Sequence, residues 1–182
     1  MNDQIPSLSR SIQSLVLEHA FRISTLSSVS SYLHLSELTL LGCGPRLLDF
    51  SPIGHLPALT RLKIVFEERS LESLSNGDQA MVGEETAMLL LSPVDLSLPI
   101  NTAPLRYLAL SSKTAVEDSA FPTPILLSSL RTFVHLEALR LKNVVIADAT
   151  SSWHDKISSL AETRIDGVEY QTGFANHGRM PR

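Results

Sequence analysis

Few side chains in this 182-residue chain could support nucleophilic or metal chemistry. Cys43 is the single cysteine, and no neighbour that would activate its thiol is evident in the sequence around it. The histidines show no HxxxH or HExxH spacing and the chain has no CxxC pair, so we expect no zinc site and no other metal. Without a nucleophile–base pair or a metal, the sequence predicts that the protein is not an enzyme and binds no cofactor.

Two further features have simpler structural explanations. Gly42 and Gly44, in the string GCGPRL, lack the third glycine, the lysine and the helix start of a phosphate-binding loop, so turn formation explains them. His34, His55 and His135 each precede a leucine, and this recurrence follows a repeat in the chain rather than a site. We expect structural roles for all five residues.

Leucine spacing is the strongest regularity of the sequence. The pattern apolar-x-x-apolar-x-apolar occurs in five windows: IQSLVL at Ile12, LSELTL at Leu35, LTRLKI at Leu59, LRYLAL at Leu105 and LEALRL at Leu136. The second window continues to Cys43 and completes the leucine-rich-repeat consensus LxxLxLxxC. Alternation within each window places every second side chain on one face of a short strand, and this face is covered only when neighbouring repeats stack.

The predicted fold class is therefore α/β: a leucine-rich-repeat solenoid with a short-stranded parallel sheet on its concave side and helices or turns on its convex side. We expect the repeat domain to span residues 1–170 and a disordered C-terminal tail to occupy residues 171–182. The windows begin at steps of roughly 23, 24, 46 and 31 residues, where 20 to 29 is usual. The long third step could hold a degenerate repeat, but its polar composition favours an insertion at about residues 67–86.

The segments between the windows carry apolar residues at helical spacing and should cover the convex side. One such set is Leu26, Val29 and Leu33, and a later set is Ile125, Leu126, Leu130 and Phe133. Two prolines in the link before the third window favour a short helical turn there. Further helices are predicted over residues 84–91 and around Trp153.

The last residues before the tail repeat the strand spacing once more. Ile165, Val168 and Tyr170 stand at the positions of the apolar residues in the five windows. This spacing predicts a degenerate closing strand.

Alternation on the predicted strands also assigns the side chains of the concave face, where a ligand would bind. The candidate partner-binding residues on this face are Glu37, Thr39, Arg61, Lys63, Tyr107, Arg140 and Lys142. The later strands are basic and carry Tyr107 as an amphipathic anchor, which favours a protein partner with an acidic segment. Two alternatives stay open: polar residues on an exposed face are needed for solubility whatever binds, and Glu37 beside Arg61 would neutralise some charge within the protein.

Charge and composition exclude several classes of protein. The net charge of -4 gives no general affinity for nucleic acid or an anionic membrane, and no apolar stretch is long enough to span a bilayer. A single cysteine cannot form an intramolecular disulfide, and the N-terminal sequence lacks the apolar run of a signal peptide. We therefore expect a cytoplasmic or nuclear protein that binds neither nucleic acid nor membrane.

The strings HLSELTLLGC, HLPALTRLKIV, APLRYLALSS and HLEALRLKNV give the chain a family resemblance. Over roughly residues 10 to 146 the sequence resembles the irregular leucine-rich repeats that follow the F-box in fungal F-box proteins. The resemblance implies a protein-binding module, the substrate-recognition part of an F-box-like ubiquitin ligase adaptor. The residues before Ile12 are too few for an F-box, so binding to Skp1 is expected only if an F-box is supplied from outside this chain. The alternative is a truncated scaffold fragment of repeats without a selected ligand.

Overall fold

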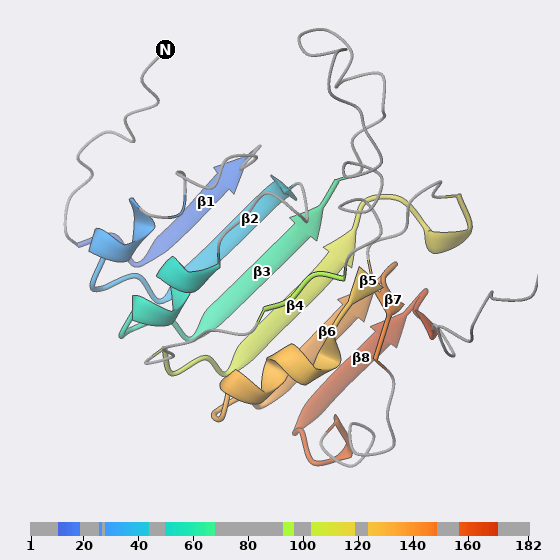
Figure 1. The fold of residues 1–182 in the computed structure, drawn as a ribbon. Coiled ribbons are helices and arrows are strands. Elements are labelled where there is room, and N and C mark those ends of the chain that lie inside the picture. Colours follow the sequence, from blue (N-terminus) through green and yellow to red (C-terminus); the bar gives the residue numbers. More distant parts are fainter. Residues whose placement is uncertain are drawn as a thin grey trace, which may run out of the picture.

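Six parallel strands form the main sheet of the protein. The structure is a computed structural model, and it describes residues 11–18, 26, 28–43, 50–67, 93–96, 103–118, 124–148 and 157–170. The strands are β1 (Ser14–Glu18), β2 (Glu37–Cys43), β3 (Arg61–Phe66), β4 (Tyr107–Ser112), β6 (Ala138–Lys142) and β8 (Glu162–Asp166). Their order in space follows their order in the chain, and every neighbouring pair is parallel (Figure 1). The prediction of an α/β fold with a short-stranded parallel sheet is confirmed.

Each of the five leucine windows forms one strand of this sheet, in the register that alternation predicts. Leu38 pairs with Leu62, Leu62 with Leu108 and Leu108 with Leu139, so equivalent positions lie side by side. The inner side chains of the four central strands are all buried: Leu38, Leu40, Leu62, Ile64, Leu108, Leu110, Leu139 and Leu141. Each fully buried leucine contributes about 1.5 to 3 kcal/mol to folding, which accounts for the strictness of the pattern.

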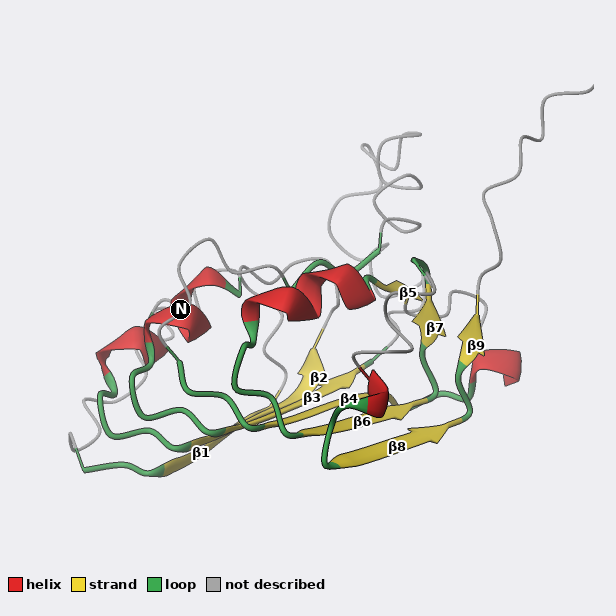
Figure 2. Ribbon diagram, turned by 90° about the horizontal axis from the view of Figure 1, so that it is seen from below, coloured by secondary structure: helices red, strands yellow, loops and turns green. Residues whose placement is uncertain are grey.

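Three 3-10 helices lie over the inner face of the main sheet: η1 (Val29–Ser31), η2 (Ser51–His55) and η4 (Leu127–Thr132) (Figure 2). A fourth, η3 (Val116–Asp118), follows β4. Apolar residues recur at every third position before a strand, as in the buried set Leu26, Val29, Tyr32 and Leu35. The backbone N–H groups of Tyr32 and Leu35 donate to carbonyl oxygens three residues earlier. Because a 3-10 helix has three residues per turn, this spacing lines the apolar side chains up toward the sheet.

The helical spacing predicted for these segments is correct only in part, because the described turns that follow Leu26 are 3-10. Leu26 and Val29 are buried as predicted, and so are Ile125, Leu130 and Phe133. Leu33, predicted on the apolar face of a helix, is 58% exposed, and Tyr32 is buried instead. In the later segment Leu126 is only half-buried and Ile125 belongs to a short strand. The buried residues that follow keep the three-residue spacing: Leu127, Leu130 and Phe133. The short helical turn predicted before the third window is confirmed as η2.

A second, smaller parallel sheet consists of β5 (Pro124–Ile125), β7 (Val145–Ile146) and β9 (Glu169–Tyr170), and Val94 forms a bridge to Ile125. β7 and β9 each follow a strand of the main sheet after a tight turn, in which Asn143 and Gly167 have φ values of 54° and 58°. A side chain at Gly167 would be strained by this φ, and its Cβ would lie 2.5 Å from Asn143 Oδ1. The turn into β9 therefore favours glycine at this position.

The last strand of the main sheet is β8, and the closing strand predicted from the sequence coincides with it only in part. Ile165 is the last inner residue of β8, but Tyr170 lies in β9 of the second sheet, and Val168 lies between the two strands. The window that matches the other five strands begins earlier and reads Leu160-x-x-Thr163-x-Ile165. Threonine stands where the other windows have leucine, so the apolar pattern misses this strand.

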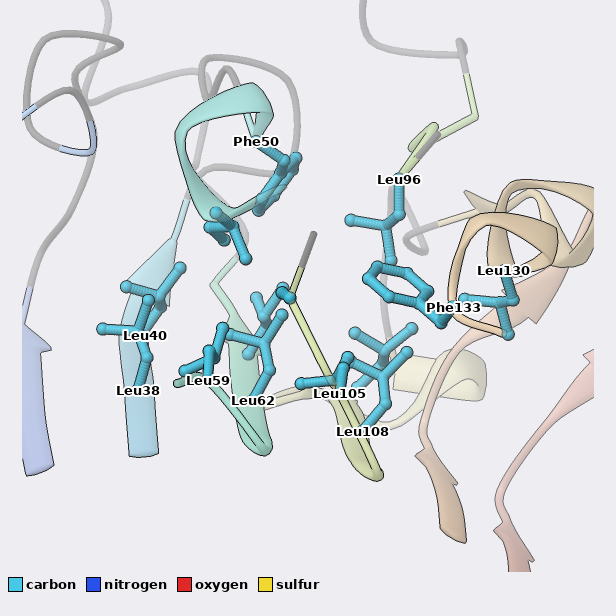
Figure 3. Packing of buried hydrophobic residues seen from close by; sticks show 14 of the residues in the cluster. Leu38, Leu40, Phe50, Leu59, Leu62, Leu96, Leu105, Leu108, Leu130 and Phe133 are labelled. Carbon is cyan, nitrogen blue, oxygen red and sulfur yellow. The ribbon is translucent and has the colours of Figure 1, made fainter. Parts of the chain in front are cut away.

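A continuous hydrophobic core fills the space between the main sheet and the covering segments. Figure 3 shows strand residues such as Leu62 and Leu108 pointing toward the segments that carry Phe50 and Phe133. The core is less complete at its two ends, where partly buried residues pack against it: Ile12, Leu15 and Leu17 at one end and Ile157, Leu160 and Val168 at the other. The end strands therefore gain less from burial than the four strands between them.

Several predictions fall on residues that the structure does not describe. These are most of the insertion at about residues 67–86, the helix over 84–91, the helix around Trp153, the tail at 171–182 and the packing of the Cys43 side chain. No helix in the described part of the chain is long and apolar enough to span a lipid bilayer.

Candidate functional site

The candidate site is the face of the main sheet that points away from the core, which we call the open face. Parallel pairing arranges its side chains in three rows, each with one residue from every strand. The first row is Ser14, Glu37, Arg61, Tyr107, Ala138 and Glu162. The second row is Val16, Thr39, Lys63, Ala109, Arg140 and Arg164. The third row is Glu18, Leu41, Val65, Ser111, Lys142 and Asp166.

All seven candidate residues from the sequence lie on the open face: Glu37, Thr39, Arg61, Lys63, Tyr107, Arg140 and Lys142. Each of them alternates along its strand with buried leucine or isoleucine residues. Because successive side chains of a strand point to opposite faces, burial of the core residues fixes the position of the seven. Their location is thus as predicted, and their role in binding stays a prediction.

A chain of contacts crosses the open face from β2 to β8, and we call it the arginine–tyrosine chain: Glu37, Arg61, Tyr107, Arg140 and Glu162. Arg61 Nε lies 3.5 Å from a carboxylate oxygen of Glu37. The Arg61 guanidinium carbon lies 4.7 Å from the centre of the Tyr107 ring, and that of Arg140 lies 5.5 Å from it. Arg140 Nη2 donates a 2.8 Å hydrogen bond to Glu162. The chain links five side chains from five neighbouring strands.

Arg140 and Glu162 form the strongest link of this chain. The hydrogen bond to Glu162 raises the pKa of the Arg140 guanidinium, and Tyr107 adds to the rise. The hydrogen bond and charge of Arg140 lower the pKa of the Glu162 carboxyl, and Arg164, with its Nε 3.3 Å from the same oxygen, adds to this effect. Arg140 Nε is covered by neighbouring atoms and has no hydrogen-bond partner among the described residues. The ends of its guanidinium are therefore the groups that interact.

The two lysines of the open face differ from its arginines. Lys63 and Lys142 form no ion pair with another described residue, whereas each arginine of the three rows does: Arg61, Arg140 and Arg164. The cross-strand neighbours of Lys63 are Thr39 and Ala109, which carry no charge. Asp166 is opposite Lys142 in the register, yet it lies beyond the 4.0 Å that defines an ion pair. Among the described residues of the open face, the positive charges without a close acidic partner are therefore those of the two lysines.

Sequence reasoning missed the contribution of β8 to the site. Glu162, Arg164 and Asp166 complete the three rows, and Glu162 forms ion pairs with two arginines. Two features of the sequence indicate this strand. Leu160 and Ile165 have the spacing of the other windows, and Leu160 follows the window at Leu136 by about 24 residues, a usual repeat length. Allowing a β-branched threonine at the middle position would have revealed the strand.

The described residues assemble no group that suggests catalysis. No cluster of three or more histidine, cysteine, aspartate or glutamate side chains in the described part of the chain could hold a metal ion. His34, His55 and His135 are exposed and lie in the turns and the 3-10 helix that lead into strands. The absence of enzyme activity stays a prediction.

Comparison with known proteins adds no relative. No protein-family model, no curated protein and no solved structure matches this chain.

Proposed function

We propose that this chain is a protein-binding leucine-rich-repeat module whose repeats stack as a solenoid, with the open face on its concave side. One observation carries the proposal. Six parallel strands follow each other in chain order, bury one face and present three rows of mostly polar or charged side chains on the other. A broad face of this kind suits an extended protein segment better than a small molecule, which needs a concave and mostly apolar pocket.

The proposed partner is a protein with an acidic segment. Arg61, Lys63, Arg140 and Lys142 supply positive charge, and Glu37 and Thr39 supply polar contacts beside them. Tyr107 is the first residue of β4, and the guanidinium groups of Arg61 and Arg140 both lie over its ring. Aromatic side chains are common anchors in protein interfaces.

The resemblance in the repeat windows supports a more specific role. Under this proposal the chain is the substrate-recognition part of an F-box-like ubiquitin ligase adaptor in the cytoplasm or the nucleus. It has no enzyme activity and needs no cofactor or metal, and it binds neither nucleic acid nor membrane. Skp1 binds only when an F-box is supplied from outside this chain.

The second candidate is a scaffold fragment without a selected ligand. The pairs Arg61–Glu37 and Arg140–Glu162 favour it, because they neutralise part of the positive charge within the protein. Under this reading the open face is solvated surface, and its ion pairs contribute little to stability.

A photo-crosslinking experiment tests the proposal. A benzoylphenylalanine residue replaces Thr39 on the open face or, as the matched control, Leu33, which is exposed in the turn before β2. We expect cells that express the Thr39 variant to yield a crosslinked protein that the Leu33 variant does not yield. The recovered protein, purified, should bind the unmodified chain. Equal crosslinking at both positions, or none at Thr39, would contradict a binding site on the open face.

A further inference from the structure

We infer that the open face holds a carboxylate-binding subsite over β4, between Lys63 on β3 and Lys142 on β6. The inference rests on the proposed protein-binding function. It narrows the seven candidate residues to two lysines and adds the hydroxyl group of Ser111 between them. The subsite binds side-chain carboxylates, which an extended acidic segment of a partner protein supplies.

Small residues between the two lysines provide the space for this ligand. The open-face residues of β4 in the second and third rows are Ala109 and Ser111, and they lie beside Lys63 and Lys142 respectively. Neighbouring strands are about 4.8 Å apart, so the backbones of β3 and β6 are separated by about 10 Å. A lysine ammonium on its flexible four-carbon stem can reach over neighbours as short as alanine and serine. Both ammonium groups can therefore approach an anion placed above β4.

One hydroxyl group can share the same anion. Ser111 lies on β4 itself, beside Lys142 in the third row. Its hydroxyl makes no hydrogen bond with another described residue. Hydroxyl and ammonium donors together satisfy several lone pairs of a carboxylate, and hydrogen bonds to a charged acceptor are stronger than neutral ones.

The arginines of the open face are poorer contacts for an incoming anion. Arg61 lies between Glu37 and Tyr107, and Arg140 lies between Tyr107 and Glu162. An anion would have to displace a carboxylate that is already present and already ordered. The arginine–tyrosine chain, which lies in the first row except for Arg140 in the second, therefore borders the subsite and does not form it.

Carboxylates on an extended protein segment fit the surrounding charges better than a nucleic acid does. The first and third rows carry acidic residues: Glu18, Glu37, Glu162 and Asp166. A polyanion with closely spaced phosphates would meet these charges on both sides of the second row, and the whole chain is acidic as well. Isolated carboxylates with neutral residues between them can reach the lysines and avoid that repulsion.

The test measures binding of a fluorescein-labelled eight-residue peptide of alternating glutamate and serine by fluorescence anisotropy at low salt. We expect Lys63→Gln and Lys142→Gln each to weaken binding about two- to fivefold, and the double variant about tenfold, because each removes one exposed charge contact. The controls are Arg106→Gln and Lys113→Gln, which remove cations that pair with Glu137 at 3.0 Å and with Glu67 at 2.7 Å. Each control should change the affinity less than twofold, and the melting temperature verifies that every variant is folded.

Several results would overturn the subsite. Binding that both lysine replacements leave unchanged, or that Arg106→Gln weakens equally, would show that the peptide does not bind between the two lysines, while the proposed binding of a protein by the open face would still stand. A phosphoserine–serine peptide that binds where the glutamate peptide does not would exclude carboxylates as the ligand. Failure of the unmodified chain to bind either peptide would also overturn the subsite, and crosslinking from Thr39 would then decide the proposed function on its own.

Discussion

Leu40 and Leu41 are neighbours in β2 with opposite environments. Leu40 is 0% exposed and packs in the core, whereas Leu41 lies in the third row of the open face. We expect Leu40→Ala to lower the free energy of unfolding by about 2 to 5 kcal/mol, through lost burial and the cavity left behind. Leu41→Ala should cost less than about 1 kcal/mol, because its side chain already meets solvent. Urea unfolding of the two variants measures the difference.

Equal losses of stability in the two variants would show that the strand register is wrong. A register shifted by one residue would exchange the two faces of the sheet, and every candidate residue of the open face would then lie in the core. This pair of substitutions therefore tests the placement of the site as well as the packing.

The difference between lysine and arginine explains how the open face divides its charges. A planar guanidinium stacks on an aromatic ring and offers several donors at once, which is the role of Arg61 and Arg140 around Tyr107. A lysine ammonium is a compact, strongly hydrated charge on a flexible stem. Lys63 and Lys142 are thus the residues best able to adapt to a partner.

At the scale of elements, η4 is held by a residue from a distant part of the chain. Its own N-cap residue, Leu126, provides no side-chain hydrogen bond. The carboxylate of Asp148, two residues after β7, instead accepts hydrogen bonds from the backbone N–H groups of Leu127 at 2.6 Å and Ser128 at 2.8 Å. These two donors would have no intrahelical partner otherwise. Asp148 therefore joins the second sheet to the layer that covers the core.

We expect Asp148→Ala to reduce the free energy of unfolding by about 1 to 3 kcal/mol, because two charge-assisted hydrogen bonds to a helix start are lost. Asp148→Asn keeps one acceptor oxygen and should cost about half as much. Asp118→Ala, at an exposed carboxylate in η3, is the control and should cost less than about 0.5 kcal/mol. Thermal and urea unfolding measure all three. A loss for Asp148→Ala no larger than that of the control would contradict the capping role.

The sequence predicts an element well where a single residue type, here leucine, occupies its buried positions. Leucine alternation located five strands and the orientation of their side chains, because each strand is a simple two-sided structure. The covering segments were harder, because spacings of 3.0 and 3.6 residues differ little over one or two turns. Only burial distinguishes Tyr32 from Leu33. β8 was mislocated because Thr163 replaces a leucine.

The candidate site was predictable in position but not in its internal contacts. Strand alternation places seven side chains on one face, yet it does not indicate which charges are already paired. The partner of Arg140 is Glu162, which is 22 residues away and lies on the strand that the apolar pattern misses. The sequence therefore does not show that the arginines are paired and the lysines are not, and only the three-dimensional structure distinguishes them.

At the scale of the whole molecule, the account depends on six strands stacked in chain order. This order brings residues from β1 to β8 onto one continuous face and places Glu162 beside Arg140. The second row crosses the entire sheet, from Val16 on β1 to Arg164 on β8. Six strands are separated by five spacings of about 4.8 Å, so the backbones of these two residues should be about 24 Å apart.

The distance between spin labels at Val16 and Arg164 is the most direct test of this arrangement. Both residues are exposed, so Val16→Cys and Arg164→Cys can carry nitroxide labels, and Cys43→Ser removes the single native thiol. Double electron–electron resonance should give a single narrow distribution centred near 24 Å, shifted by only the few ångströms that the label arms add. A broad distribution, or a mean distance beyond about 40 Å, would show that β8 is not the sixth strand of the sheet and would contradict the assembly of the open face.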